Sequence, residues 1–423
     1  MKLQSAIGLG GLVLAVMGGF AACGSGSASD GAGGLVTEFD STSHPDSVIA
    51  RVAGAVPPNA VRHLVELMRI APAADDTSLF TQIADFKVGP DGRIFVYDWS
   101  THAIFQFDST GALLRRIGRH GAGPGEFNQN SGMVVLPDGG LAQFDSRNGR
   151  ISFLSSAGDF DSSWVVTRGF STSDGLVSDG SGGLLLRRPV TEPRDGEILG
   201  RMGLVRLGPG GAFADSLVPP DLPVKRITYV ASSGGSTSSM SPRHSAHFMW
   251  AWHRDGYFVA ADGGEYAIEV SRPGRALRIV RESAPIPVPA DERAWEEEFI
   301  TFANRRNVPD WVFSGPPMPD TKAPLVGLEV DRDGRIWARV ATPSERIPDD
   351  ELAPPRPNGP PSPLYRDRQA FEVYATDGHF LGRVELSQNA QWMAADGNIV
   401  WTLERDADGL PAVVRSHVEP AFP

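Results

Sequence analysis

The feature that most constrains this chain is a repeating pattern of short apolar runs joined by tight-turn residues. Residues 83–118, IADFKVGPDGRIFVYDWSTHAIFQFDSTGALLRRIG, contain four such runs. The first two runs are joined by Gly-Pro-Asp-Gly and the last two by Asp-Ser-Thr-Gly, and both sequences are turn signals between alternating segments. Each pair of runs is therefore predicted to form a β-hairpin. Four short antiparallel strands in succession are typical of one blade of a β-propeller.

The pattern returns along the chain. In residues 132–160 it recurs with Asp138 in the place of Asp91, a step of 47 residues, which lies in the range of propeller repeats. Degenerate copies with the same order of runs and turns follow. They lie at 175–190 with 202–218, at 247–280, at 325–340 with 369–386, and at 391–418.

The last copy is one strand short. Residues 62–70, RHLVELMRI, precede the first blade and lack a partner of their own, so we expect them to complete the last blade and to close the ring. A helix is the alternative, since Leu64, Leu67 and Met68 also fit a helical stripe. The predicted fold is all-β: a six-bladed β-propeller over residues 61–420, its ring closed by an N-terminal strand, with one helical insertion.

The glycine-rich stretch IGRHGAGPGEF, residues 117–127, joins the first two blades. A phosphate-binding glycine loop needs a following helix or a Gly-Lys-Ser/Thr sequence, and the chain offers neither here. We therefore interpret the stretch as a connector between blades. With the run before it, it resembles the NHL-type repeat of six-bladed β-propellers, over roughly residues 80–160. The whole chain resembles exported bacterial six-bladed propeller lipoproteins, a group without a common assigned activity.

The N-terminus is predicted to be an export signal. Lys2 precedes an apolar stretch of 15 residues, shorter than the roughly 20 residues that a membrane-spanning helix needs. The segment FAAC, ending at Cys23, resembles a bacterial lipobox, although Phe20 departs from the usual aliphatic residue. We expect a lipoprotein signal peptide over 1–22, lipid attachment at Cys23, and a flexible tether and N-terminal extension over 23–60. Ordinary signal cleavage, with Cys23 incidental, is the alternative.

The charge balance argues against one class of partner, and the cysteine count argues against covalent or metal cross-links. The chain carries 39 Lys and Arg against 51 Asp and Glu, a net charge of −12, which repels phosphate backbones and argues against a nucleic-acid partner. Cys23 is the single cysteine, so neither a disulfide within the chain nor a cysteine-based metal site is expected. The fold is therefore expected to rely on its hydrophobic core.

Long insertions fall on one face of the predicted propeller. Residues 216–245 and 281–324 connect blades, and residues 341–368 interrupt the fifth blade. The opposite face keeps tight turns, so binding loops are expected on the insertion-bearing face. Neutral variation of a solvated rim is the alternative.

The second and third insertions differ in character. The second contains the one clear helix, residues 289–307, in which Trp295, Phe299 and Phe302 recur at i, i+4 and i+7. Acidic residues at its start and arginines at its end suit the helix dipole, and we expect this helix to pack on the propeller as a lid. The third insertion is rich in proline and is expected to form an extended flap.

Polar residues near the starts of the first strands are expected to point into the central channel. They are Gln82, Asn130, Asp174, His247, Lys322 and Gln391. The loop residues Asp98, Asp145, Asp262 and Glu265 would add oxygens, although an Asp that ends a strand is also a common turn former. Calcium prefers several carboxylate and amide oxygens. The channel set holds a single carboxylate, which is poor for the calcium site of lactonase-like propellers.

Histidines and aromatic residues add two further hypotheses. His102, His120 and His247 are expected on the insertion-bearing face, whereas His247 and His253 would lie about 20 Å apart along one strand and cannot share a zinc ion. We expect no cofactor, with calcium or zinc only if the protein is an enzyme. The stretch HFMWAWH, residues 247–253, alternates aromatic side chains. It predicts packing between blades or an aromatic platform for a sugar or peptide.

These observations favour a membrane-tethered, exported propeller on the periplasmic or cell-surface side. It would act as a monomeric ligand-binding or protein-interaction scaffold for a small molecule, glycan or peptide. The binding candidates are Asp98, His102, Asn130, Asp145, Asp174, His247, Asp262, Glu265 and Gln391. The alternative is a metal-dependent hydrolase or lyase, lactonase-like or peptidyl-hydroxyglycine-lyase-like, with its ion over the central channel. A fold does not determine a function. The choice between the scaffold and the enzyme therefore depends on which side chains the structure brings together.

Overall fold

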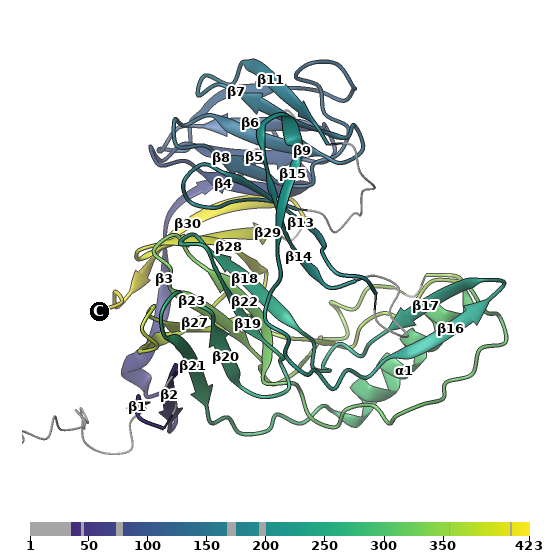
Figure 1. Cartoon of the computed structure of the whole chain (residues 1–423). Helices are drawn as coiled ribbons and strands as arrows, with labels where there is room; N and C mark the ends of the chain where they lie inside the picture. Colours follow the sequence, from purple (N-terminus) through teal and green to yellow (C-terminus); the bar gives the residue numbers. More distant parts are fainter. Residues whose placement is uncertain are drawn as a thin grey trace, which may run out of the picture.

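The computed structural model (Figure 1) describes residues 35–43, 46–72, 79–166, 175–193, 200–354, 356–406 and 408–423. The predicted signal peptide, the lipidation candidate Cys23 and the channel candidate Asp174 lie outside these residues. The described chain is mostly β-structure, with one α-helix, α1 (Ala290–Arg305), and the short 3-10 helices η1 (Pro58–Ala60) and η2 (Pro209–Gly211). None of the helices in these ranges has the length and apolarity to cross a membrane.

The predicted repeats correspond to antiparallel sheets in which strands that follow each other along the chain pair. The first repeat forms β4 (Ile83–Val88), β5 (Ile94–Asp98), β6 (Ala103–Phe107) and β7 (Leu113–Ile117). The second forms β8 (Met133–Val135), β9 (Leu141–Asp145), β10 (Arg150–Leu154) and β11 (Phe160–Val165). The third forms β12 (Gly175–Ser178), β13 (Leu184–Pro189), β14 (Met202–Leu207) and β15 (Phe213–Leu217).

The remaining repeats carry additions to the same plan. The fourth forms β18 (Met249–His253), β19 (Tyr257–Ala261), β20 (Ala267–Val270) and β21 (Ala276–Arg281). The fifth forms β22 (Leu325–Val330), β23 (Ile336–Val340), β26 (Ala370–Tyr374) and β27 (Phe380–Glu385), and the last forms β28 (Ala390–Asp396), β29 (Ile399–Arg405) and β30 (Pro411–Glu419).

Residues 62–70 form a strand, as expected, and not a helix. This strand, β3 (Val61–Ile70), pairs antiparallel with β30 along its length and ends with Ile70 opposite Val413. It supplies the fourth strand that the last repeat lacks. Its first two residues also pair in parallel with β27, so β3 links the sheets of the fifth and last repeats.

The N-terminal extension within residues 23–60 contains two strands that the sequence did not predict. β1 (Val36–Asp40) and β2 (Ser47–Ala53) form an antiparallel pair, and β2 lies parallel to β21. The fourth repeat is therefore a six-stranded sheet. Ala50 and Val52 are 0% and 1% exposed and join the core that contains Leu277. Burial of this apolar face stabilises the paired arrangement over a solvated tether.

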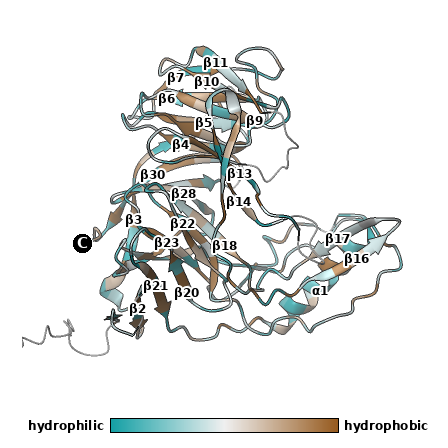
Figure 2. Cartoon of the chain, in the orientation of Figure 1, coloured by the Kyte–Doolittle hydropathy of each residue, from teal (hydrophilic) through white to brown (hydrophobic). Residues whose placement is uncertain are grey.

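The core consists of apolar clusters that lie between consecutive sheets, and the hydrophobic colours of Figure 2 follow the strands. Representative buried residues are Phe127 between the first and second repeats, Leu186 between the second and third, Leu185 between the third and fourth, Ile268 between the fourth and fifth, Val373 between the fifth and last, and Trp401 between the last and first. Each sheet therefore packs against a neighbour on both of its faces.

The glycine-rich stretch 117–127 has the expected form of a connector, and no helix follows it. Phe127 is fully buried, with its ring centre 6.4 Å from that of Tyr97. Gly118 has a φ of +77°, and a Cβ at this position would lie 2.3 Å from the Phe127 ring, so only glycine fits. Arg150 of β10 donates hydrogen bonds to three carbonyls of the loop.

Candidate functional site

The three predicted insertions meet in one accessory structure, here termed the cap. It comprises the hairpin β16 (Tyr229–Ser233) and β17 (Ser236–Met240), the helix α1, and the segment between β24 (Glu345–Arg346) and β25 (Tyr365–Arg366), here termed the flap. Figure 1 shows α1, β16 and β17 together, projecting beside the sheets. The hairpin is a correction to the prediction, which gave residues 216–245 only as a connector.

The hairpin is held by the segments around the helix. The Trp311 Nε1–H donates to the Val230 carbonyl at 3.0 Å, and the Tyr229 hydroxyl donates to the Pro316 carbonyl at 2.8 Å. The rings of Tyr229 and Phe313 lie 4.6 Å apart. Because Tyr229 is 1% exposed, these contacts form a small core of the cap itself.

The helix forms within the predicted range, and it contacts the flap. The Trp295 Nε1–H donates to the Pro361 carbonyl of the flap at 3.3 Å, and its ring stacks on Phe299 at 5.6 Å. The Tyr365 hydroxyl lies 2.8 Å from a carboxylate oxygen of Asp291, in the first turn of α1. The apolar face of the helix therefore packs under the flap.

A buried polar cluster, here termed the anchor, joins the cap to the fifth repeat. His244 Nε2 lies 2.9 Å from Glu292 Oε1, and the Ser344 hydroxyl donates to Glu292 Oε2 at 2.6 Å. Lys322 Nζ lies 2.6 Å from Asp367 Oδ1 and 2.8 Å from the Thr342 carbonyl. The anchor takes its groups from all three insertions, so it fixes them relative to one another.

The electrostatics of the anchor follow from its burial. His244, Glu292 and Lys322 are 5%, 1% and 5% exposed. Burial disfavours the ionised Glu292, but hydrogen bonds from His244 and Ser344 outweigh this effect and lower its pKa. Lys322, which the sequence places in the channel, lies in the anchor instead. The anchor groups bind one another, so we interpret the cluster as a structural support.

A groove separates α1 from the flap. It has a volume of about 620 Å³ and continues into a second hollow of about 460 Å³, and the two share Phe302 and Pro360. Its lining residues include Glu298, Leu352 and Arg356. The groove is mainly apolar with charged edges, a character suited to a small ligand or an extended chain.

The two loop aspartates Asp98 and Asp145 have the same local role. Oδ1 of Asp98 accepts the backbone N–H groups of Thr81 and Gln82, at 3.0 and 2.6 Å. Asp145 accepts those of Asn128 and Gln129, at 2.6 and 3.2 Å. Both aspartates are 0% exposed. Each carboxylate therefore ties the loop before a first strand to the end of the second strand, the turn-forming role that the sequence left open.

Of the three histidines expected on the insertion-bearing face, the structure brings two together. The rings of His102 and His120 lie 4.6 Å apart, and the Trp99 ring lies 5.1 Å from His102. Burial, and then the charge of His120, lower the pKa of His102. His102 has a φ of +50°, unusual for a residue with a side chain. His247 is half-buried elsewhere and contacts the Ser245 carbonyl.

The other candidates do not form a single constellation. The Asn130 Nδ2–H donates to Asp85 Oδ2 at 3.0 Å, beside the start of β8. Asp262 Oδ1 accepts the backbone N–H groups of the next loop, including that of Glu265, whose side chain is exposed. Gln391 is exposed on β28. Within the described ranges, no three His, Cys, Asp or Glu residues lie close enough to hold a metal ion, so we derive no metal-dependent step.

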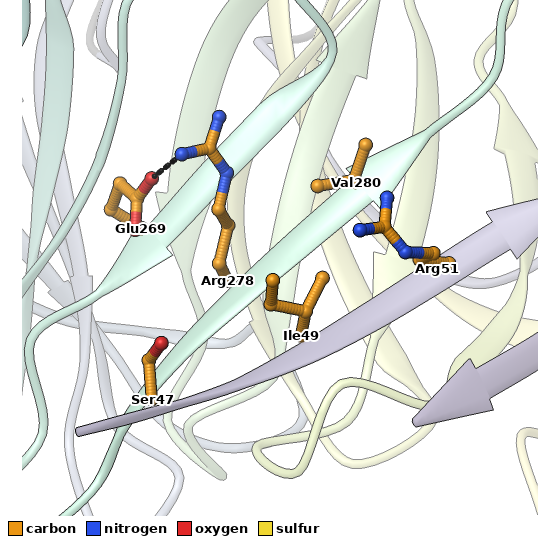
Figure 3. A pocket seen from close by; sticks show the side chains of 6 residues that line it. All are labelled: Ser47, Ile49, Arg51, Glu269, Arg278 and Val280. Carbon is orange, nitrogen blue, oxygen red and sulfur yellow. Dashed lines mark ion pairs between the residues drawn. The ribbon is translucent and has the colours of Figure 1, made fainter. Parts of the chain in front are cut away.

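The N-terminal strands create a further hollow, of about 390 Å³, on the fourth sheet (Figure 3). Ile49 and Val280 form its floor, and Arg51 rises beside them. Arg278 pairs with Glu269 at 3.2 Å. This hollow depends on β2, which the sequence did not predict, so no sequence signal could have identified it.

Charged residues of the third and fifth sheets lie near one another, although none of them is a candidate from the sequence. Arg187 lies on β13, and its guanidinium carbon is 4.8 Å from the ring centre of Trp250 on β18. Glu329 of β22 interacts electrostatically with Arg187 and with Arg339. The alternation in β13 is the signal that could have revealed Arg187, because it puts this charge on the face of Leu185, toward the next sheet.

Comparison with known proteins supports the fold. Residues 64–138 match a family described as a 6-bladed β-propeller. A member of the DUF4221 family from Bacteroides vulgatus has 11% sequence identity and a TM-score of 0.51, covering 86% of this chain and 100% of that one. No curated protein matches the sequence. The chain therefore has a β-propeller fold, and the low identity shows the fold alone.

Two further solved structures are similar at lower scores. A candidate exported protein from Bacteroides fragilis has 10% identity and a TM-score of 0.45, covering 86% of this chain and 96% of that one. The PQQ-bound aldose sugar dehydrogenase from Streptomyces coelicolor has 12% identity and a TM-score of 0.41, covering 86% and 100%.

Proposed function

We propose that this β-propeller is an exported, membrane-tethered binding module. In this proposal the chain forms a six-bladed ring, a lipid on Cys23 anchors it outside the cytoplasm, and the capped face binds a small molecule, glycan or peptide. The protein acts as a monomer. The observation that carries the proposal is the convergence of three separate insertions into one cap, fixed by the buried anchor.

The pairing of β3 with β30 supports the ring. β3 precedes the first repeat, and β30 is the last strand of the chain, so their pairing brings the two ends of the propeller together. An apolar cluster around Trp401 packs the last repeat on the first. Without this pairing β30 would expose an edge, and propellers avoid exposed edges by closure. The six apolar interfaces between consecutive repeats are those that a closed ring of six blades requires.

The anchor supports a binding role for the cap. Burying His244, Glu292 and Lys322 costs free energy unless their partners are fixed, and all three are paired here. Loops that vary neutrally on a solvated rim have no need of such an arrangement. A groove between α1 and the flap adds a concave surface on this face.

A binding screen with a flap variant tests the proposal. The variant replaces residues 347–364 with a short Gly-Ser linker, and a Pro137→Ser variant in an exposed turn of the opposite face is the control. All three proteins are screened against a glycan array and a peptide library after thermal melts establish that they fold. We expect ligands that the wild type and the control bind and that the flap variant loses. Equal binding by the flap variant, or an absence of ligands for the wild type, contradicts the proposal.

A further inference from the structure

Arg187 is the first of two arginines that follow the three leucines of β13. Leu184 and Leu186 of β13 pack toward the second repeat, and Leu185 packs toward the fourth. Side chains alternate along a strand, so Arg187 shares the direction of Leu185 and lies over Trp250. The residue opposite Arg187 on β12 is Gly175, which has no side chain to crowd the guanidinium.

The guanidinium of Arg187 has an unused hydrogen-bonding capacity. It carries five N–H donors, yet it forms no hydrogen bond or ion pair to any residue in the described ranges. Two arginines of the same repeat are paired: Arg206 of β14 binds Asp179 at 2.9 Å, and Arg201, just before β14, donates to the carbonyls of Pro219 and Pro220. The free donors of Arg187 therefore distinguish it from its structural neighbours.

Arg187 combines exposure to solvent with a surrounding of protein atoms. The side chain is exposed to solvent, yet burial by the surrounding protein lowers its pKa. Glu329 shows the same combination, because it is exposed while burial raises its pKa, with Arg339 and Arg187 acting in the opposite direction. No ion pair within 4.0 Å joins Glu329 to Arg187 in the described structure. The two side chains therefore lie near enough to interact electrostatically, without direct contact.

We infer that Arg187, held against Trp250 where the third sheet meets the fourth, binds the oxyanion of a small molecule, a carboxylate or a phosphate group. The inference rests on the proposed function, since it names the chemical class of the ligand for the same face. A guanidinium presents two parallel N–H groups to either oxyanion. The Trp250 ring fixes the guanidinium before a ligand arrives, which reduces the loss of side-chain freedom on binding.

Glu329 sets a limit on this ligand. A carboxylate near Arg187 repels an anion, and Arg339 acts against that charge. A singly charged oxyanion is therefore favoured over a highly charged one. It also follows that neutralising Glu329 strengthens the binding of a simple anion.

Calorimetric titration of the purified protein with inorganic phosphate and with glucuronate, at constant ionic strength, tests the inference. Arg187→Met removes the charge and keeps the chain length, and we expect it to weaken binding at least tenfold. Arg187→Lys keeps the positive charge but lacks the two parallel N–H groups of the guanidinium, so its affinity should lie between those of the wild type and Arg187→Met. Glu329→Gln should bind several-fold more tightly than the wild type. Arg116→Met is the matched control, since Arg116 lies 5.8 Å over the Phe105 ring on an outer strand.

Each outcome decides the inference. Binding of phosphate alone identifies a phosphate ester as the ligand class, and binding of glucuronate alone identifies a carboxylate. If the wild type binds neither, or if Arg187→Met binds as tightly as the control, the inference fails. Should Arg187→Met not fold, the opposite shifts of Arg187→Lys and Glu329→Gln still decide the question. Loss of library ligands in the flap variant without any anion binding would leave the proposed function standing and refute this inference alone.

Discussion

Removing the Glu292 carboxylate should undock the cap without unfolding the sheets. In Glu292→Ala, His244 and Ser344 both lose their hydrogen-bond partner at Glu292. His244 is 5% exposed, so its imidazole cannot regain the bond from water without opening the site. An unsatisfied buried polar group costs about 1–3 kcal/mol. With Ser344 only half-buried, we expect a loss of about 2–4 kcal/mol in the docking free energy of the cap.

Hydrogen exchange of the α1 backbone measures this loss directly. If the cap opens locally, about 2–4 kcal/mol corresponds to about 30- to 700-fold faster exchange of its amides. The amides of β5 and β29, far from the anchor, should exchange at the wild-type rate. Glu297→Ala is the control, because Glu297 lies on the same helix with an exposed side chain.

The pH dependence provides a second readout of the same interaction. The pKa of Glu292 is lowered in the folded protein, so its contribution is fully present above the ordinary carboxyl value of about 4.3 and is lost as the pH falls through the folded value. The protection of the α1 amides, relative to their intrinsic exchange rate at each pH, should therefore fall below about pH 4.3 in the wild type, and less so in Glu292→Ala. Unchanged α1 exchange in the variant at neutral pH would refute the role of the anchor.

Three further predictions concern the whole chain. Deleting residues 61–70 removes the pairing of β3 with β30, and we expect the whole domain to unfold cooperatively, so that a thermal melt of the variant lacks the wild-type transition. An unaltered transition would rule out ring closure by this strand. Cys23→Ser should move the protein from the membrane fraction to the soluble fraction, and retention in the membrane would disprove lipid attachment at Cys23. Elemental analysis of protein purified without chelator should find no stoichiometric calcium or zinc, whereas one ion per chain would favour the metal-dependent hydrolase or lyase.

Local patterns predicted the strands that are joined by tight turns. The runs around the Gly-Pro-Asp-Gly turn at 89–92 became β4 and β5, because the turn geometry and the alternation of side chains are both local properties. The helix was also predictable, as 289–307 against the observed Ala290–Arg305. The incomplete last repeat allowed β3 to be predicted as a strand. The last repeat lacked its fourth strand and residues 62–70 lacked a partner, so pairing the two accounted for both.

The site was less predictable, because sequence position says little about which polar groups already have partners. Asp98 and Asp145 were candidates, but their carboxylates accept backbone N–H groups of nearby loops. His244 and Glu292, 48 residues apart, were not candidates as a pair, and only the docking of α1 brings them to 2.9 Å. Arg187 was not predictable as a site residue, since arginines at the end of a strand usually face solvent.

By itself, the sequence determined the elements and the order in which neighbouring strands pair, because turn residues and alternation act over a few residues. It also determined that insertions gather on one face. The tertiary structure decided three matters: the parallel docking of β2 on β21, the assembly of the cap around the anchor, and the approach of Arg187 to Glu329. Each joins residues far apart in the chain, and their contact depends on the twist and packing of whole sheets, which no local pattern encodes.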